Sequence, residues 1–215
     1  MKIVLFGATG NIGQRITAEA LSRGHEVTGV VRDPSVARSS DARVKLVRGD
    51  ATDESAVAGA AKGADAVVCA ISPRPNKQGL PAPSLAKAAR GLIAGPPRAG
   101  VKRLLVVGGA GTLTVGGKRL LDLPTFPKEY KAEAQSAADA LEVYKNEASK
   151  LEWTFLSPAA EIGPGKRSGN YRTTGDELLA DPQGKSFITF EDYAVAVLDE
   201  LEKPKHVRQR FGVAY

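Results

Sequence analysis

Residues 2–13 read KIVLFGATGNIG, and this stretch decides the fold. A mostly apolar run ends at three glycines spaced as G-x-x-G-x-x-G, and a helical pattern follows. Strand, glycine turn and helix in this order are typical of a dinucleotide-binding unit. The stretch therefore predicts a dinucleotide site at the turn, and a plain strand-to-helix turn with incidental glycines is the alternative.

Each of the three glycines has its own expected part in such a site. Gly7 allows the tight turn out of the strand, and Gly13 lets the helix pack against the strand. Gly10 lets the backbone approach a pyrophosphate, because a Cβ at this position would collide with it. The amides and the positive dipole end of the helix would then face the phosphates.

Composition bounds the class of protein. The 215 residues, 42% of them hydrophobic, suit a single domain spanning residues 1–215 with a sizeable core. Cys69 is the sole cysteine, which excludes a disulfide framework and favours a reducing cytoplasm. The apolar run at the N-terminus stops at Gly7 and no run approaches membrane-spanning length, so we expect a cytoplasmic protein without a signal peptide. The net charge of +6 suits a dinucleotide phosphate, and no aromatic-interleaved basic stripe indicates nucleic acid.

The rest of the chain alternates predicted strands with predicted helices. Strands are expected at residues 26–31, 44–47, 66–71, 103–107, 153–156, 187–189 and 210–213. Helices are expected at residues 12–23, 52–62, 85–93 and 128–149, and after Thr189, which should cap the last helix with Asp192 in the capping-box position. This alternation predicts an α/β fold with a doubly wound parallel sheet and a small C-terminal lobe, roughly residues 157–215, on the substrate side.

Several local features complete this plan. The first helix should turn three charged side chains to water, namely Arg15, Glu19 and Arg23. The Gly-Pro-Pro of residues 95–97 should break the end of the third helix. Residues 72–83, 113–127 and 163–175 should form irregular segments, and a loop as long as 113–127 beside the expected site is more often functional than idle.

The end of the second strand bears on the choice of cofactor. Arg32 stands there, where an arginine suits the 2′-phosphate of NADP and an acidic residue would suit the ribose hydroxyl of NAD. Asp33 follows, but Pro34 should turn it away. We therefore expect NADP(H) to be preferred over NAD(H), with a solvated arginine as the alternative. Asp50, after the third strand, can accept from the adenine amino group or serve as a cap or turn residue.

The glycine motif, Arg32, Gly49-Asp50 and the run of residues 107–111 resemble those of the atypical short-chain dehydrogenase/reductases. Within them the chain is most similar to the NmrA-like and flavin-reductase-like NAD(P)H-binding proteins, with the likeness extending through residues 157–160 and 191–194. The resemblance implies a Rossmann fold and a set of cofactor contacts. These are Gly7, Thr9, Gly10, Asn11, Ile12 and Gly13 at the pyrophosphate, Arg32 at the 2′-phosphate, Asp50 and Ala51 beside the adenine, Ala70 and Ile71 beside a ribose, Gly108, and Pro158 and Ala159 against the nicotinamide.

The chain departs from the catalytic members of that family at one point. Those enzymes carry Tyr-x-x-x-Lys on the helix after the fifth strand, whereas no tyrosine here has a lysine four residues on. Flavin and biliverdin reductases of similar build also lack the pair, because a conjugated acceptor can take its proton from solvent. Tyr130 and Lys131 could donate to a substrate, or could be a packing tyrosine and a solvated lysine.

Other chemistry has little support in the sequence. His25 and His206 are isolated and lack metal-ligand spacing, so we expect no metal site. Cys69 lies in a predicted buried strand and reads as an inert core thiol. We expect an NAD(P)H-dependent reductase of a flavin, quinone or similar small-molecule acceptor. The alternatives are a non-catalytic NADP(H) sensor that binds a regulatory protein and, third, a sugar-nucleotide or steroid enzyme, with a homodimer as a further expectation.

Overall fold

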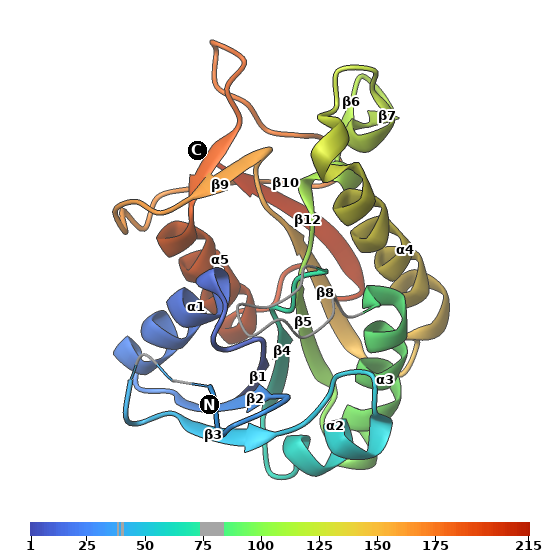
Figure 1. Cartoon of the computed structure of the whole chain (residues 1–215). Helices are drawn as coiled ribbons and strands as arrows, with labels where there is room; N and C mark the ends of the chain where they lie inside the picture. The colour runs from blue at the N-terminus through green and yellow to red at the C-terminus, as the bar shows by residue number, and fades with distance from the viewer. Residues whose placement is uncertain (38, 40, 74–83) are drawn as a thin grey trace.

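The computed structural model describes residues 1–37, 39, 41–73 and 84–215, and the predicted loop 72–83 therefore lies largely outside the described residues. Its main sheet has eight strands in the order β10-β12-β8-β5-β4-β1-β2-β3, and all neighbours are parallel except β10 and β12 (Figure 1). The strands are β1 (Lys2–Phe6), β2 (Glu26–Val31), β3 (Lys45–Arg48), β4 (Ala66–Cys69), β5 (Arg103–Val107), β8 (Glu152–Ser157), β10 (Arg172–Thr174) and β12 (Gln209–Ala214). The predicted Rossmann-like α/β fold is confirmed.

Helices cover both faces of this sheet. They are α1 (Asn11–Ser22) and α5 (Phe190–Glu202) on one face, and α2 (Glu54–Ala61), α3 (Leu85–Arg98) and α4 (Lys131–Glu147) on the other. Alternate residues of β1 explain the two layers, because Ile3 packs in the core beneath α1 and α5 whereas Val4 packs beneath α2 and α3. Among the described residues, no helix is both long and apolar enough to cross a membrane.

Helix α3 continues through the Gly-Pro-Pro of residues 95–97, so the predicted break at that point is wrong. Proline has a φ that is already helical, and Gly95 lacks the Cβ that would collide with the following proline ring. Both proline carbonyls accept N–H groups from residues 99–101 at 2.9–3.1 Å, which completes the last turn. Gly100 then ends the helix at φ +78°.

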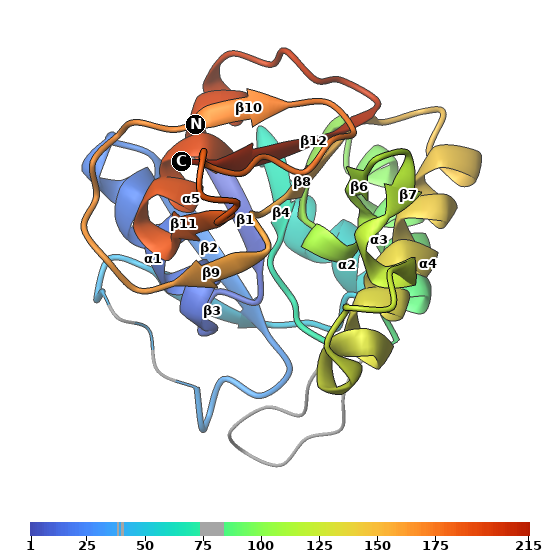
Figure 2. The ribbon, with the colours of Figure 1, turned by 90° about the horizontal axis from the view of Figure 1, so that it is seen from above.

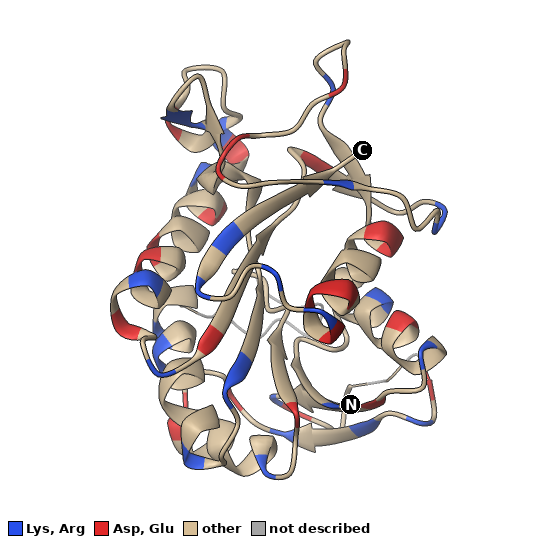
Figure 3. Cartoon of the chain, turned by 180° about the vertical axis from the view of Figure 1, so that it is seen from behind, with Lys and Arg blue, Asp and Glu red and all other residues tan. Residues whose placement is uncertain are grey.

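The prediction that Glu19 faces water is also wrong, because Glu19 is only 6% exposed. Its carboxylate accepts from Arg23 Nε at 2.8 Å and from Arg167 Nε at 2.7 Å. Arg15 likewise pairs with Glu191 of α5 at 3.1 Å. Seen from behind, acidic and basic residues are interspersed over this side of the molecule (Figure 3). Charged side chains of α1 therefore form ion pairs with neighbouring segments instead of pointing into the solvent.

Residues 157–215 divide between the main domain and a small lobe. Helix α5 and strand β12 join the main layers, and Thr189 caps α5 as predicted, accepting from Asp192 N at 3.0 Å. The lobe contains the parallel pair β9 (Glu161–Gly163) and β11 (Phe187–Thr189), seen from above in Figure 2. The segment predicted as turns at 163–175 contains β10, which adds an antiparallel edge to the main sheet.

The predicted loop 113–127 contains short regular elements. These are the hairpin of β6 (Thr114–Val115) and β7 (Lys118–Arg119), followed by the 3-10 turn η2 (Leu120–Asp122). Backbone hydrogen bonds join it to the lobe, from Thr114 N to Asp176 O and from Leu178 N to Thr114 O, both at 2.8 Å. The segment is thus attached at the carboxyl side of the sheet, beside the end of β5.

Candidate functional site

The carboxyl ends of the parallel strands meet at one edge of the sheet. The chain winds away from β1 in both directions, to β2 and β3 on one side and to β4 and β5 on the other. Ligands of open α/β sheets bind at this switch point. Here Ala70 N donates to Phe6 O at 2.8 Å, so the exits from β1 and β4 lie side by side.

The three glycines of the motif differ in what surrounds them. Gly7 has φ +85°, and a Cβ on it would lie 2.6 Å from Ala70 O. A Cβ on Gly13 would lie 2.1 Å from the Gly7 carbonyl oxygen. Around Gly10 the nearest atom to a built Cβ is Gly7 O at 3.4 Å. Gly7 and Gly13 are therefore required by the fold itself, whereas Gly10 leaves open space on the exposed side of the turn.

The start of α1 is exposed at the same place. Gly10 is the N-cap residue and supplies no side-chain cap, and Thr9 and Asn11 are exposed beside it. Thr9 is held through its carbonyl, which accepts from Gln14 Nε2 at 3.0 Å, while Ile12 packs partly into the core beneath α5. Amides at an uncapped helix start suit a phosphate, so the predicted pyrophosphate contacts stand on an accessible turn.

Two arginines meet at the ends of β2 and β3. Arg48 donates from Nε to the Arg32 carbonyl oxygen at 3.3 Å. Asp33 Oδ1 accepts from Ser35 N at 3.0 Å and from Ser35 Oγ at 2.7 Å, and these bonds, helped by the charge of Arg48, lower the pKa of Asp33. Asp33 is thus folded onto its own turn, as Pro34 led us to expect. Sequence reasoning did not single out Arg48. Its place at the end of β3, the strand next to β2, could have indicated that it lies near Arg32.

Asp50 and Ala51 lie just beyond β3. Asp50 Oδ1 accepts from Thr52 N and Thr52 Oγ1, both at 2.8 Å, which is the turn role that we kept as an alternative. Ala51 is buried, and a Cβ on Gly91 of α3 would lie 2.2 Å from its carbonyl oxygen. Their contacts with an adenine remain predictions.

The ends of β5 and β8 form the other half of the edge. Gly108 N donates to Leu156 O at 2.7 Å, and a Cβ on Gly108 would lie 2.2 Å from the Phe155 ring. Pro158 and Ala159 are buried directly after β8. The half-buried Ala70 and Ile71 follow β4, which lies on the other side of β5. The structure therefore brings the predicted ribose and nicotinamide contacts to one edge.

Sequence reasoning missed a pair of buried hydroxyls at this edge. Thr112 Oγ1 lies 3.0 Å from Ser157 Oγ and donates to Gly109 O at 2.9 Å. The pair joins the segment after β5 to the end of β8. In the sequence, the pair could have been noticed from Thr112, which directly follows the glycine-rich run of residues 108–111.

Comparison with known proteins agrees with this geometry. Residues 7–204 match the model of an NAD(P)H-binding family. The chain belongs to this NAD(P)H-binding family. Three solved structures are similar to it along nearly the whole of both chains.

The first is "Putative exported protein" from Burkholderia pseudomallei, 44% identical with TM-score 0.89, covering 100% of both chains. The second is the "putative epimerase" from Bacteroides thetaiotaomicron, 38% identical with TM-score 0.88, covering 100% of this chain and 96% of that one. The third is a "putative NADH-flavin reductase" from Streptococcus pneumoniae, 32% identical with TM-score 0.81, covering 100% of this chain and 99% of that one. The cytoplasmic location expected from the sequence stays a prediction.

In this NAD(P)H-binding protein, α4 lies close against the glycine run after β5. A Cβ on Gly111 would lie 2.8 Å from Ala134 Cβ, and one on Gly109 would lie 3.1 Å from Ala137 Cβ. Tyr130 ends the 3-10 turn η3 (Lys128–Tyr130) just before α4 and is 51% exposed. The residue four positions after Tyr130 is thus a buried alanine in contact with the site edge.

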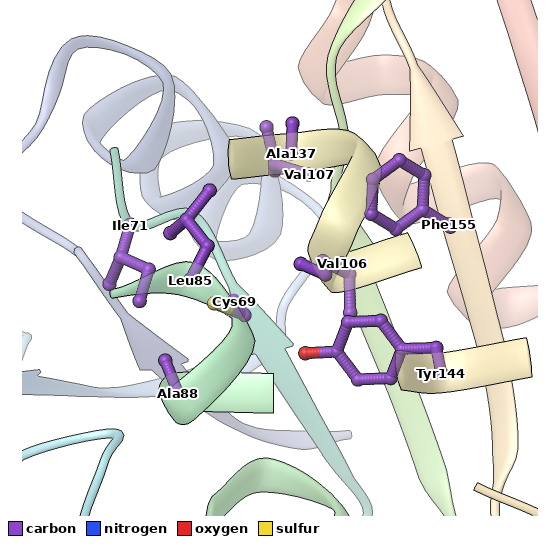
Figure 4. Close-up of a pocket in the computed structure, with 10 residues that line it drawn as sticks. Cys69, Ile71, Leu85, Ala88, Val106, Val107, Ala137, Tyr144 and Phe155 are labelled. Atoms are coloured by element: carbon purple, nitrogen blue, oxygen red, sulfur yellow. The ribbon is translucent and has the colours of Figure 1, made fainter. Parts of the chain in front are cut away.

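A small apolar cavity lies beneath this edge, between β4, β5, α3 and α4 (Figure 4). Its volume is about 20 Å³, and the hydroxyl of the buried Tyr144 points into it. Cys69 lines it, and burial raises the pKa of the Cys69 thiol to about 12. The thiol is therefore protonated at neutral pH, as expected of an inert core cysteine, and the cavity is too small to hold a dinucleotide.

The two histidines are each paired with one carboxylate. His25 Nε2 lies 2.7 Å from Glu202 Oε1, and His206 Nδ1 lies 2.9 Å from Glu200 Oε2. Within residues 1–37, 39, 41–73 and 84–215, no group of three or more His, Cys, Asp or Glu side chains could hold a metal ion.

Proposed function

We propose that this chain is an NADPH-dependent reductase that passes hydride to a conjugated small-molecule acceptor, such as a flavin or a quinone. The bound nicotinamide supplies the hydride, and the protein orients the cofactor and excludes water. The NAD(P)H-binding family supports the cofactor, and the Streptococcus neighbour named as an NADH-flavin reductase supports the kind of acceptor.

The contact between Ala134 and Gly111 is the main support for a conjugated acceptor over a simple ketone. A lysine at position 134 would complete a Tyr-x-x-x-Lys pair with Tyr130, yet this position holds an alanine packed onto the end of the site. The chain therefore does not carry the Tyr-x-x-x-Lys pair at Tyr130. A ketone needs a proton as hydride arrives, whereas a flavin or quinone spreads the charge over its rings.

The preference for NADPH rests on Arg32. Asp33 Oδ1 accepts hydrogen bonds from Ser35 N and Oγ, and Arg32 directly follows β2, where an arginine suits a 2′-phosphate. A charge-assisted hydrogen bond of this kind contributes about 1.5–3 kcal/mol, or about ten- to a hundred-fold in affinity.

Calorimetric titration with NADPH and NADH tests the cofactor. Arg32→Ala should remove most of the preference for NADPH and leave NADH binding nearly unchanged. Arg43→Ala is the matched control, because Arg43 is exposed and already paired with Asp41 at 2.7 Å. Equal affinities of the wild type for both cofactors would contradict the proposal.

A non-catalytic NADP(H) sensor is the second candidate, and the alanine at position 134, where the Tyr-x-x-x-Lys pair would need its lysine, favours it. NADPH absorbance followed with a panel of flavins and quinones separates the two. Turnover supports the reductase, and tight binding without turnover supports the sensor. The Bacteroides neighbour is named as an epimerase, so a sugar nucleotide belongs in the panel. We expect no reaction with it, because carbonyl–alcohol chemistry needs the missing acid.

A further inference from the structure

The last residue of β3 is paired in register with the last residue of β2. Arg48 is the Cα partner of Val31 in the parallel register, and Gly49 N donates to Val31 O at 2.9 Å, one step beyond it. A Cβ on Gly49 would lie 2.6 Å from Val30 Cγ1, so the chain leaving β3 is pressed against β2. The backbone of Arg48 therefore has little freedom at the edge where the cofactor's adenosine half is expected.

The side chain of Arg48 is anchored at one atom. Its Nε donates to the Arg32 carbonyl oxygen at 3.3 Å, and the residue is exposed. A guanidinium carries five N–H donors, and this bond uses one of them. The anchor holds the planar group next to Arg32 and leaves its terminal amino groups for a further acceptor.

The position of the Arg48 guanidinium is not explained by an ion pair with a nearby carboxylate. Asp33, the acidic residue that follows Arg32, directs its Oδ1 to Ser35 N and Oγ. In the part of the chain that the structure describes, no carboxylate forms an ion pair with Arg48. The end of β3 thus holds a guanidinium group, that of Arg48, which forms no ion pair in the described part of the chain and lies beside the backbone of Arg32.

We infer that Arg48 is a second binding residue for the 2′-phosphate of the cofactor and helps to set the choice of NADPH over NADH. This inference rests on the proposed function, which assigns Arg32 to the same phosphate. A phosphate monoester carries up to two negative charges, and planar guanidinium groups on two adjacent strand ends can neutralise it from two sides. Arg48 then acts through its terminal amino groups, and its Nε bond to the Arg32 carbonyl sets their position.

The test uses adenosine 2′,5′-bisphosphate and AMP as probes, because they differ only in the 2′-phosphate and both lack the nicotinamide. Arg48→Ala should weaken the binding of adenosine 2′,5′-bisphosphate by about ten-fold, the loss expected for one charge-assisted contact, and leave the binding of AMP nearly unchanged. Arg43→Ala again serves as control, since it removes one exposed charge just before β3 and should alter neither affinity. Equal melting temperatures of the wild type and the three variants, Arg32→Ala, Arg48→Ala and Arg43→Ala, would establish that the variants are folded.

The results separate this inference from the proposed function. Loss of selectivity in both Arg32→Ala and Arg48→Ala supports two binding arginines. Selectivity that falls in Arg32→Ala and persists in Arg48→Ala overturns the role of Arg48 alone. A wild type that binds both probes equally overturns the NADPH preference and this inference together. If Arg43→Ala lost as much affinity for adenosine 2′,5′-bisphosphate as Arg48→Ala, the effect of Arg48 would be one of general surface charge. That result would also overturn the inference.

Discussion

Gly13 lies directly against Gly7: a Cβ on Gly13 would stand 2.1 Å from the carbonyl oxygen of Gly7. The oxygen belongs to the backbone and a Cβ is bonded directly to the backbone, so neither atom could move aside as the end of a flexible side chain would. This contact brings the first turn of α1 onto the exit from β1. It thereby shapes the turn on which the cofactor's pyrophosphate is expected to lie.

Substitutions at Gly13 and Gly10 should therefore separate folding from binding. Gly13→Ala should lower the free energy of unfolding by about 1–3 kcal/mol or more, since it overpacks a backbone contact. Gly10→Val should keep the fold, because the space around Gly10 is open, and should abolish NADPH binding. Chemical denaturation and NADPH fluorescence measure the two effects. A folded Gly10→Val that binds NADPH normally would place the cofactor elsewhere.

A buried ion pair lies at the opposite edge of the sheet. Arg103 Nη2 lies 3.2 Å from Glu200 Oε1, and both side chains are less than a tenth exposed. Arg103→Met should cost up to about 3–5 kcal/mol of unfolding free energy, because it removes the guanidinium beside the buried Glu200 carboxylate and leaves it with His206 Nδ1 and two backbone amides. Arg90→Met, which breaks the exposed pair with Glu147, should cost about 0–1 kcal/mol. Similar costs for both variants in urea denaturation would contradict this reading of the pair.

Stability should also depend on Glu19 at acid pH. Hydrogen bonds from Arg167 and Arg23 outweigh burial and lower the pKa of Glu19 below its ordinary value of 4.5. Its contribution to stability is therefore complete above pH 4.5 and is lost as the pH falls through the lower, folded-state pKa. Glu19→Gln should flatten the acid side of the stability curve, whereas Glu26→Gln, at an exposed position, should not. An acid limb unaltered in Glu19→Gln would argue against this role.

The protonated state of Cys69 makes a chemical prediction. Burial raises the pKa of its thiol to about 12, and the residue is only 4% exposed. A thiol reagent at neutral pH should therefore leave the native protein almost unmodified and react fully once denaturant is added. Fast modification of the folded protein, followed by absorbance, would show that Cys69 is accessible.

Local signals in the sequence were enough to predict the frame of the molecule. The apolar run of residues 2–6, the three glycines and Gly24 mark β1, its turn and α1 without any distant contact. Strand β5 and strand β11 match their predicted bounds for the same reason. The edge that holds the predicted cofactor contacts then follows from the strand order alone.

What the sequence did not predict depends on distant partners. Glu19 is buried because Arg167, 148 residues further on, reaches it. Strand β10 is only three residues long and exists through its pairing with β12. Arg48 became a candidate binding residue only because its Nε donates to the carbonyl oxygen of Arg32, 16 residues earlier at the end of the neighbouring strand. The pattern within a single helix or strand does not reveal such pairs.

The most direct measurement follows NADPH oxidation side by side with a quinone, a flavin and a simple ketone, in the wild type and in Tyr130→Phe. A positioned acid typically contributes about 10²–10⁴-fold to such a proton transfer, and the proposed reductase has none. We expect turnover of the quinone or the flavin, none of the ketone, and only a modest effect of Tyr130→Phe. Robust ketone reduction that collapses in Tyr130→Phe would contradict the account, because it would make Tyr130 a true acid.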